Sequence, residues 1–284
     1  MTVLTRTART VSLPSGEAIP ALGQGTWHMA EDPRRRKEEI GALRFGIDLG
    51  MTLIDTAEMY ADGAAEQLVG EAIEGFRDDV FLVSKVLPHH ATVRGTIEAC
   101  ERSLARLGVD ELDLYLLHWR GAVPLEETLE AFDTLVGAGK IRNWGVSNFD
   151  LPDMEELVNL PEGNSVSTDQ VLYNLEHRGI EFDLLPWCER GQVPIMAYSP
   201  IEQGELLRHP ILTSVAARHE ATPAQAALAW VLRHENVCAI PRATKSLHVR
   251  ENRGALDIRL SAADLAELDR AFPPPTRKQP LAEH

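Results

Sequence analysis

Short β-rich runs alternate with longer helical stretches along nearly the whole chain, and this order restricts the fold more than any other feature of the sequence. Eight runs have the composition of strands, and they begin near residues 20, 52, 79, 112, 141, 167, 193 and 237. Between them, apolar residues recur three and four positions apart, which is typical of one face of a helix. Strands that alternate with helices form parallel sheets. Eight such units predict an α/β fold with (β/α)8 architecture, the TIM barrel.

A doubly wound open sheet is the alternative, but such sheets usually have fewer strands and a glycine-rich first turn. Residues 11–22, with "PSGE" as the turn, predict a β-hairpin, which we expect to close the N-terminal end, or bottom, of the barrel. Residues 273–284 are rich in proline and polar residues, which predicts an irregular C-terminal tail over the surface. We expect residues 1–284 to form a single domain, since a chain of this length buries one large core.

The composition excludes several classes of function. A formal charge of −15 and a pI of about 5.1 argue against nucleic-acid binding, which needs cations on phosphates. Cys100, Cys188 and Cys238 are far apart and odd in number, so we expect buried fillers and no disulfide framework or zinc site. His89 and His90 are adjacent but have no acidic ligand nearby in the sequence, so we expect no metal.

The sequence also predicts where the protein resides. No run of 18 apolar residues occurs, so we expect no membrane association. The first 20 residues lack an apolar segment of signal-peptide length. We therefore expect a cytoplasmic protein.

Polar side chains end several of the predicted strands, where the active site of such a barrel lies. Asp55, Lys85 and His118 end three successive strands, and Tyr60 follows five residues after Asp55. Taken singly, each has an ordinary role as a helix cap, a solvated strand end, a core histidine or a packing tyrosine. Their joint occurrence at neighbouring strand ends favours one common site, in which Asp55 pairs with an otherwise buried Lys85.

These four side chains suit the protonation of a carbonyl oxygen. A free phenol has a pKa near 10, so Tyr60 alone is a poor acid at neutral pH. A lysine ammonium beside it favours the phenolate and is expected to lower that pKa, while Asp55 holds the lysine in place. A neutral His118 can donate a hydrogen bond that orients the carbonyl. Because hydride must then reach the carbonyl carbon, the chemistry is carbonyl reduction and needs a hydride source.

A nicotinamide cofactor fits the remaining strand ends. Ser147, Asn148 and Gln170 offer donors and acceptors for a carboxamide, and Tyr198 offers a ring to stack on the nicotinamide. Residues 240–253 follow the eighth strand, open a helix and carry four arginines and lysines against one acid. Phosphate sites occur at this place in barrels, although a solvated helix face is the alternative interpretation.

From end to end, the chain resembles the aldo-keto reductase family. The segments "LIDTAEMY", "VFLVSK", "LDLYLLHW", "IRNWGVSNF", "AYSP" and "IPRATKSLHVREN" follow the family's signatures in the family's order. The resemblance implies Tyr60 as general acid with Asp55, Lys85 and His118 as its partners. "AEMYADGAAEQLVGEAI" and "RGIEFDLLPWC" are similar to a bacterial branch that includes methylglyoxal reductases, which implies small aldehydes and dicarbonyls as substrates.

The resemblance also implies the residues that contact ligands. Those of the cofactor are Thr26, Ser147, Asn148, Gln170, Tyr198, Ser199, Pro200, Ile201, Arg242, Ala243, His248, Glu251 and Asn252, with the Glu251–Asn252 pair on the adenine. Those of the substrate are Trp27, Leu87 and Trp119. Members of the family are usually NADPH-dependent monomers or small oligomers, so we expect NADPH, no metal, and a monomer or small homo-oligomer.

Two departures from the family pattern bear on specificity. Arg242, Ala243 and His248 stand where the family often has lysine, serine and arginine on the 2′-phosphate of NADPH. Arg242 can still bind that phosphate, but Ala243 lacks a hydroxyl, so use of NADH as well stays an open alternative. Arg120 stands where proline is common, and it either attracts an anionic substrate to the pocket rim or points to solvent.

We therefore expect an oxidoreductase that reduces small aldehydes, ketones or dicarbonyls, such as methylglyoxal, to alcohols with hydride from NADPH. Two alternatives belong to other classes. Lys85 would form a Schiff base in an aldolase-like barrel enzyme. A weakly active or non-catalytic subunit that senses nucleotides would keep the cofactor pocket without turnover.

Overall fold

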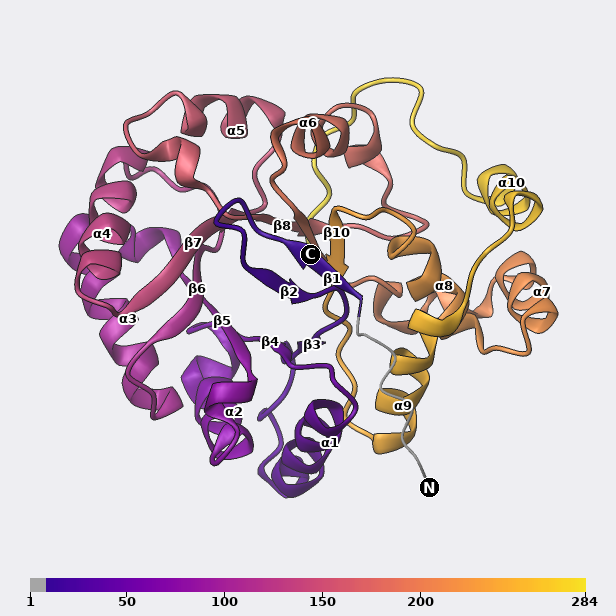
Figure 1. Ribbon diagram of the computed structural model, residues 1–284, viewed down its shortest axis with the longest axis horizontal. Helices are drawn as coiled ribbons and strands as arrows, with labels where there is room; N and C mark the ends of the chain where they lie inside the picture. Colours follow the sequence, from indigo (N-terminus) through magenta and orange to yellow (C-terminus); the bar gives the residue numbers. More distant parts are fainter. Residues whose placement is uncertain (1–8) are drawn as a thin grey trace.

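The computed structural model describes residues 9–284, in which eight parallel strands form a barrel surrounded by helices (Figure 1). The strands pair in chain order from β3 to β10. They are β3 (Gln24–Gly25), β4 (Leu53–Asp55), β5 (Phe81–Val86), β6 (Leu112–Leu117), β7 (Ile141–Ser147), β8 (Asp169–Leu172), β9 (Ile195–Tyr198) and β10 (Val237–Ala239). A parallel bridge between Leu22 and Ala239 closes the barrel. The predicted TIM barrel is confirmed, and the open doubly wound sheet is wrong.

The predicted hairpin precedes the barrel and lies across it in Figure 1. Strands β1 (Thr10–Ser12) and β2 (Ala18–Pro20) pair antiparallel. Their turn contains Gly16 at φ +85°, a conformation that glycine adopts without strain. Glu17 accepts a hydrogen bond from Asn143 at 3.0 Å, which connects the hairpin to the N-terminal half of β7. The hairpin therefore covers the N-terminal end of the strands, as predicted.

Helices connect successive strands and form the outer layer. They are α1 (Arg36–Asp48), α2 (Ala64–Ile73), α3 (Val93–Leu107), α4 (Leu125–Gly137), α5 (Leu151–Val158), α6 (Leu184–Gly191), α7 (Pro210–Arg218), α8 (Pro223–Val231), α9 (Ser246–Gly254) and α10 (Ala262–Ala271). Two helices, α7 and α8, lie between β9 and β10, and α9 and α10 follow β10. Helices α7 and α10 contact each other at the outer edge of Figure 1.

Local sequence signals set the ends of these helices. Thr92 caps α3 by accepting a hydrogen bond from the backbone N–H of Gly95 at 3.1 Å, a contact of about 1 kcal/mol. The same helix ends at Gly108, whose φ of +67° is a left-handed cap. Asp150 caps α5 with a reciprocal bond to Asp153. These caps fix where the helices begin and end, and they therefore set the lengths of the loops that connect them to the strands.

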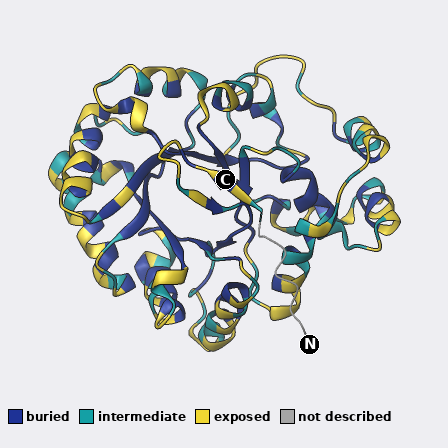
Figure 2. Cartoon of the chain, in the orientation of Figure 1, coloured by how far each residue is buried: buried dark blue, intermediate teal, exposed yellow. Residues whose placement is uncertain are grey.

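The core occupies the barrel and the layer between strands and helices. All residues of β5 and β6 are buried, as expected for parallel strands that are covered on both faces (Figure 2). Each fully buried leucine or isoleucine contributes about 1.5–3 kcal/mol. Residues 273–284 form no helix or strand. No helix in residues 9–284 is long and apolar enough to cross a membrane. The prediction about a signal peptide concerns in part residues 1–8, which lie outside the described residues.

Alternation along β5 determines which side chain faces the barrel interior. Ser84 donates a hydrogen bond to Glu66 of α2 at 2.6 Å, so Ser84 faces the helical layer. Successive residues of a strand point to opposite faces, and Lys85 therefore points into the barrel. Its position near the carboxyl end of the strand places it at the top, opposite the hairpin.

Candidate active site

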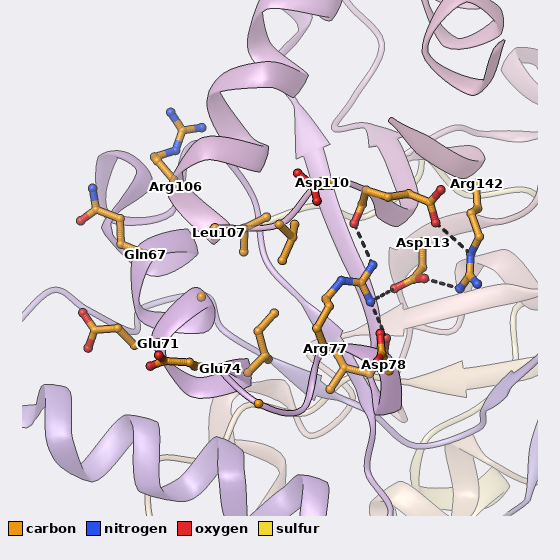
Figure 3. A pocket seen from close by; sticks show the side chains of 17 residues that line it. Gln67, Glu71, Glu74, Arg77, Asp78, Arg106, Leu107, Asp110, Asp113 and Arg142 are labelled. Atoms are coloured by element: carbon orange, nitrogen blue, oxygen red, sulfur yellow. Dashed lines mark hydrogen bonds and ion pairs between the residues drawn. The ribbon is translucent and has the colours of Figure 1, made fainter. Parts of the chain in front are cut away.

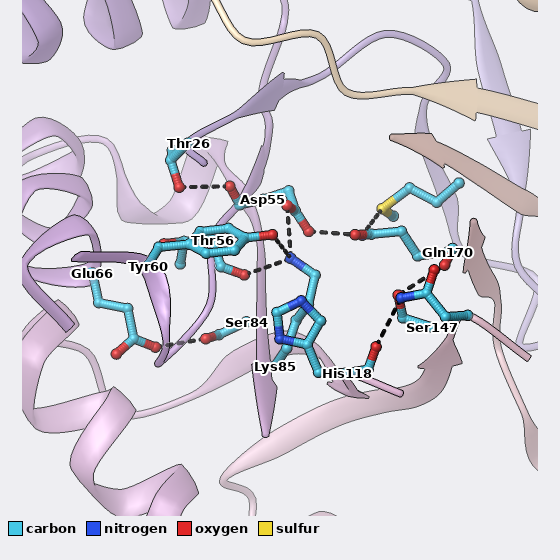
Figure 4. A network of polar contacts seen from close by, with 12 residues as sticks. Thr26, Asp55, Thr56, Tyr60, Glu66, Ser84, Lys85, His118, Ser147 and Gln170 are labelled. Atoms are coloured by element: carbon cyan, nitrogen blue, oxygen red, sulfur yellow. Dashed lines mark hydrogen bonds and ion pairs between the residues drawn. The ribbon is translucent and has the colours of Figure 1, made fainter. Parts of the chain in front are cut away.

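The four predicted catalytic residues meet at the carboxyl ends of β4, β5 and β6 (Figure 4). The Nζ atom of Lys85 lies 2.8 Å from Oδ2 of Asp55 and 3.1 Å from the hydroxyl of Tyr60. Lys85 also donates to the carbonyl oxygen of Thr56 at 2.9 Å. The predicted pairing of Lys85 with Asp55 is confirmed. Lys85 thus holds the phenol and the carboxylate in one fixed arrangement.

The loop after β4 carries Tyr60 into this site. Ala61 and Asp62 adopt positive φ angles of 48° and 51°, which turn the chain sharply after the tyrosine. Oε1 of Glu58 accepts hydrogen bonds from the backbone N–H of Leu87 at 2.8 Å and contacts Nδ1 of His90 at 2.9 Å. These contacts attach the Tyr60 loop to the loop after β5.

His118 forms the side of the site next to the phenol. Its ring packs edge-on against Tyr60, with centroids 5.8 Å apart, and against Trp119 at 4.9 Å. Burial, and secondarily the charge of Lys85, holds the pKa of His118 well below its usual value. Within the described residues its Nδ1 atom has no hydrogen-bond partner. His118 is therefore neutral at physiological pH, the form that the sequence argument required.

The expectation that the pKa of Tyr60 is lowered is wrong. Burial, followed by the negative charge of Asp55, raises the pKa of Tyr60 well above its usual value. Burial also lowers the pKa of Lys85, against the opposing charge and hydrogen bond of Asp55. The cost of burying a phenolate thus outweighs the benefit of a neighbouring cation. Tyr60 stays protonated, which is the form that can give a proton to a substrate.

Polar side chains from β7, β8 and β9 form the opposite wall. The hydroxyl of Ser147 donates to the carbonyl oxygen of Gln170 at 2.8 Å, and the hydroxyl of Tyr198 donates to Oδ1 of Asn148 at 2.9 Å. Nε2 of Gln170 donates to Oδ1 of Asp55 at 2.8 Å. This last bond connects the wall predicted for a carboxamide to the carboxylate that pairs with Lys85.

One cavity of about 640 Å³ runs along these residues. The predicted site residues that line it are Trp27, Asp55, Tyr60, His118, Trp119, Ser147, Asn148, Gln170, Tyr198, Ser199, Pro200, Ile201, Arg242, Ala243 and His248. Its walls join the Tyr60 site to the basic segment after β10. A single elongated ligand can therefore reach both.

Five predicted site residues do not line this cavity. They are Thr26, Lys85, Leu87, Glu251 and Asn252. The hydroxyl of Thr26 donates a hydrogen bond to the backbone carbonyl oxygen of Asp55 at 2.9 Å, and Lys85 lies fully buried beneath Tyr60. Glu251 and Asn252 lie on α9. Their assigned ligand contacts stay predictions.

The C-terminal tail also lines the cavity, together with residues that the sequence did not single out. The ring of His284 lies 5.9 Å from that of Trp27, and its Nε2 atom lies 3.4 Å from Glu202. Further lining residues are Gly25, His28, Met59, Gln203, Gly204, Leu207, Ile240, Pro241, Thr244 and Glu283. No local pattern marks the tail residues, because only the fold brings them to the cavity.

Arg120 is held away from the cavity. Its two terminal nitrogens bind the carboxylate of Glu156 on α5 at 3.0 and 2.9 Å. A second carboxylate, that of Asp153, lies 3.5 Å away. Because Arg120 is neutralised by α5 and does not line the cavity, the suggestion that it attracts an anionic substrate is not supported.

A larger hollow of about 960 Å³ lies at the other end of the strands, between α2 and α3 (Figure 3). Arg77 and Arg142 both bind the buried carboxylate of Asp113. This carboxylate also accepts a hydrogen bond from the backbone N–H of Leu82 at 2.6 Å. These charges satisfy one another near the N-terminal ends of the strands. The smaller cavity, in contrast, is lined by three of the four predicted catalytic residues, Asp55, Tyr60 and His118.

The paired histidines have an acidic neighbour that the sequence did not reveal. His90 contacts Glu58, and the ring of His89 lies 4.2 Å from that of His90. Among residues 9–284, however, no three histidine, cysteine, aspartate or glutamate side chains are grouped so that they could hold a metal ion.

The chain is similar to known proteins in sequence and in structure. A model of the aldo/keto reductase family matches residues 21–272. Methylglyoxal reductase YeaE of Escherichia coli (strain K12) is 54% identical over 269 residues, covering 93% of this chain and 95% of that protein. Glyoxal reductase of Bacillus subtilis (strain 168) is 35% identical over 263 residues, covering 92% and 91%. The crystal structure of an aldo-keto reductase from Klebsiella pneumoniae in complex with NADPH is 52% identical, with a TM-score of 0.96, and the match covers 98% of this chain and 100% of that one.

Proposed function

The chain belongs to the aldo/keto reductase family, and we propose that it reduces small aldehydes, ketones and dicarbonyls such as methylglyoxal to alcohols with NADPH. The observation that carries this proposal is the protonated phenol of Tyr60, held 3.1 Å from Lys85 beside a neutral His118. The names of the relatives, a methylglyoxal reductase and a glyoxal reductase, support the substrate class.

The cavity fits a nicotinamide dinucleotide in its chemistry. Near Tyr60 it offers the hydroxyl of Ser147, the amides of Asn148 and Gln170, and the ring of Tyr198. At its other end it offers the guanidinium of Arg242. An amide-rich end and a cationic end match a carboxamide and a phosphate. When bound, NADPH supplies the hydride.

The residues of the chain then handle the proton. His118 presents a neutral ring that binds and orients the carbonyl oxygen of the substrate. Tyr60 donates its hydroxyl proton to that oxygen as hydride reaches the carbonyl carbon. The developing phenolate is stabilised by Lys85, whose ammonium lies 3.1 Å from the hydroxyl, and Asp55 holds the ammonium in place. The cation thus acts on the transition state, where charge appears, more than on the resting phenol.

The environment of the cavity also indicates which carbonyl compounds bind. Trp27, Met59, Trp119 and Leu207 are apolar residues in the lining of the cavity. Arg120 is bound to Glu156 and offers no free cation to a substrate carboxylate. We therefore expect uncharged aldehydes and dicarbonyls to be reduced more efficiently than oxo-acids.

Neither alternative function fits the structure as well as the reductase does. Schiff-base chemistry needs an accessible lysine, whereas Lys85 is fully buried and bonded to Asp55, Thr56 and Tyr60. A subunit that only senses nucleotides would not need the proton-donating set to be assembled. Both alternatives are weaker than the reductase on these grounds.

The direct test is oxidation of NADPH, and then of NADH, by the purified protein with methylglyoxal as acceptor. Rapid loss of absorbance at the nicotinamide band with NADPH supports the reductase. Tight NADPH binding without turnover, over a panel of small aldehydes, would contradict it and favour the nucleotide-sensing alternative.

The pH dependence of turnover is expected to be flat from about pH 6.5 to 10. Tyr60 must be protonated, and its raised pKa keeps the proton until the pH exceeds the usual value of a phenol. His118 must be neutral, and its lowered pKa keeps it so until the pH falls well below the usual value. The measurement is kcat against pH at saturating NADPH. A step in kcat between pH 7 and 9 would contradict this account.

Replacing Arg242 with alanine is expected to raise the Kd for NADPH by about tenfold or more and to change that for NADH little. A hydrogen bond between arginine and phosphate contributes about 1.5–3 kcal/mol, and only NADPH carries the 2′-phosphate. Isothermal titration with both cofactors measures the effect. An equal loss of affinity for NADPH and NADH would show that Arg242 does not bind the 2′-phosphate.

A further inference from the structure

Arg35, which does not itself line the cavity, contacts a lining residue at its basic end from a distant part of the chain. It ends the short helical turn Pro33–Arg35, which precedes α1. Its Nη2 atom donates to the hydroxyl oxygen of Thr244 at 2.6 Å, across 209 positions in sequence. Thr244 follows β10 and lines the cavity beside Arg242. A loop from the first βα unit is therefore fastened to the loop after the eighth strand.

This contact places two guanidinium groups near each other. The pKa of Arg242 is lowered, first by burial and then by the positive charge of Arg35. Glu39 and Glu31 act in the opposite direction on Arg242. Two like charges held close together disfavour the folded chain unless an anion lies between or beside them.

The acidic neighbours of this pair also have other partners. Glu39 accepts the backbone N–H of Ala30 at 2.9 Å, and Glu31 contacts His28 at 2.6 Å. Glu38 lies 3.6 Å from Nε of Arg35, with both side chains about half exposed, so water screens that pair. The two arginines thus bring two guanidinium groups to one region of a chain whose formal charge is −15. Arginine binds phosphate through paired N–H donors, which is the ligand chemistry that suits the site.

We propose that Arg35 is a cofactor-specificity residue that binds the 2′-phosphate of NADPH together with Arg242. The inference rests on the proposed function in that it takes NADPH as the ligand. It adds to the segment after β10 a second cation, supplied by the opposite end of the chain and held in place by Thr244. It also supplies a phosphate-binding group to a segment in which Ala243 offers no hydroxyl.

The test compares Arg35→Met with Arg34→Met in the full chain. Arg34 is the adjacent arginine of the same turn, but its side chain is exposed and binds Asp32 at 2.8 Å, so its removal deletes the same charge without touching Thr244. Isothermal titration measures the Kd for NADP⁺, NAD⁺, adenosine 2′,5′-bisphosphate and 5′-AMP. Arg35→Met is expected to weaken both 2′-phosphorylated ligands about tenfold and the other two less than twofold. Arg34→Met is expected to change all four less than twofold.

Further measurements separate phosphate binding from a structural brace. Arg35→Lys keeps the charge and should restore part of the affinity for NADP⁺. A phosphate contact also makes binding depend on salt, so Arg35→Met should show a shallower fall of NADP⁺ affinity between 50 and 300 mM salt. Equal losses for NADP⁺ and NAD⁺, or an unchanged affinity for NADP⁺, would overturn the inference, and the proposed reductase function would still stand. Selective loss of NADP⁺ binding in a chain that reduces no carbonyl would support the inference and overturn the proposed function instead.

Discussion

Replacing Tyr60 with phenylalanine is expected to abolish carbonyl reduction, by about 10²–10⁴-fold in kcat, because it removes the proton donor. Lys85 lies 3.1 Å from that hydroxyl and is buried too deeply to replace it. The ring remains, so the edge-on contact with His118 and the wall of the cavity are kept. The Kd for NADPH should therefore change less than threefold. Stopped-flow turnover and isothermal titration measure the two quantities separately.

The matched control is Tyr115→Phe. Tyr115 is a buried tyrosine of β6 that packs against Phe132 and does not line the cavity. This variant loses the same atom from the same residue type, so it should retain the kcat of the wild type. If Tyr60→Phe kept normal turnover, the general acid would have to be another group, and the proposed mechanism would fall.

The sequence predicts this site well because the barrel simplifies the geometry. Parallel strands in a closed barrel place their carboxyl ends on one face, so residues that end neighbouring strands are neighbours in space. That rule alone predicts that Asp55 pairs with Lys85, and in the structure Oδ2 of Asp55 lies 2.8 Å from Nζ of Lys85. The barrel itself follows from the eight alternating units, although the pattern does not predict α7, which is inserted between β9 and β10.

The sequence does not predict features that depend on how deeply a side chain is buried or on contacts between residues far apart in the chain. The pKa of Tyr60 moves in the direction opposite to that expected, because its burial emerges from the packing of several loops. The contact of Glu58 with His90 and that of Arg35 with Thr244 join residues that no spacing rule relates. The position of His284 in the cavity depends on the path of a tail without regular structure. Such features can be identified only in the folded structure.

Replacing Lys85 with methionine is expected to lower both stability and activity. Lys85 is fully buried, and its loss leaves the carboxylate of Asp55 buried with Gln170 as its only side-chain hydrogen-bond donor among residues 9–284. Breaking a buried ion pair from one side costs about 3–5 kcal/mol in the free energy of unfolding. The same change removes the cation that stabilises the phenolate of Tyr60. We therefore expect a clear loss in urea unfolding and at least about a hundredfold loss in kcat. The surface variant Lys37→Met should change the free energy of unfolding by less than about 0.5 kcal/mol.

The double variant Asp55→Asn, Lys85→Met separates these two effects. Neutral asparagine can still accept the hydrogen bond that Gln170 donates to Oδ1 of Asp55 at 2.8 Å, and no unpaired charge is left in the barrel. Much of the lost stability should therefore return, since the penalty came from an uncompensated carboxylate. Activity should stay low, because the double variant lacks the positive charge that Lys85 places beside the phenol of Tyr60. A double variant that recovered wild-type kcat would show that the ion pair serves folding alone. Recovery of stability without activity would place Lys85 in the chemistry, where the 3.1 Å contact with Tyr60 positions it.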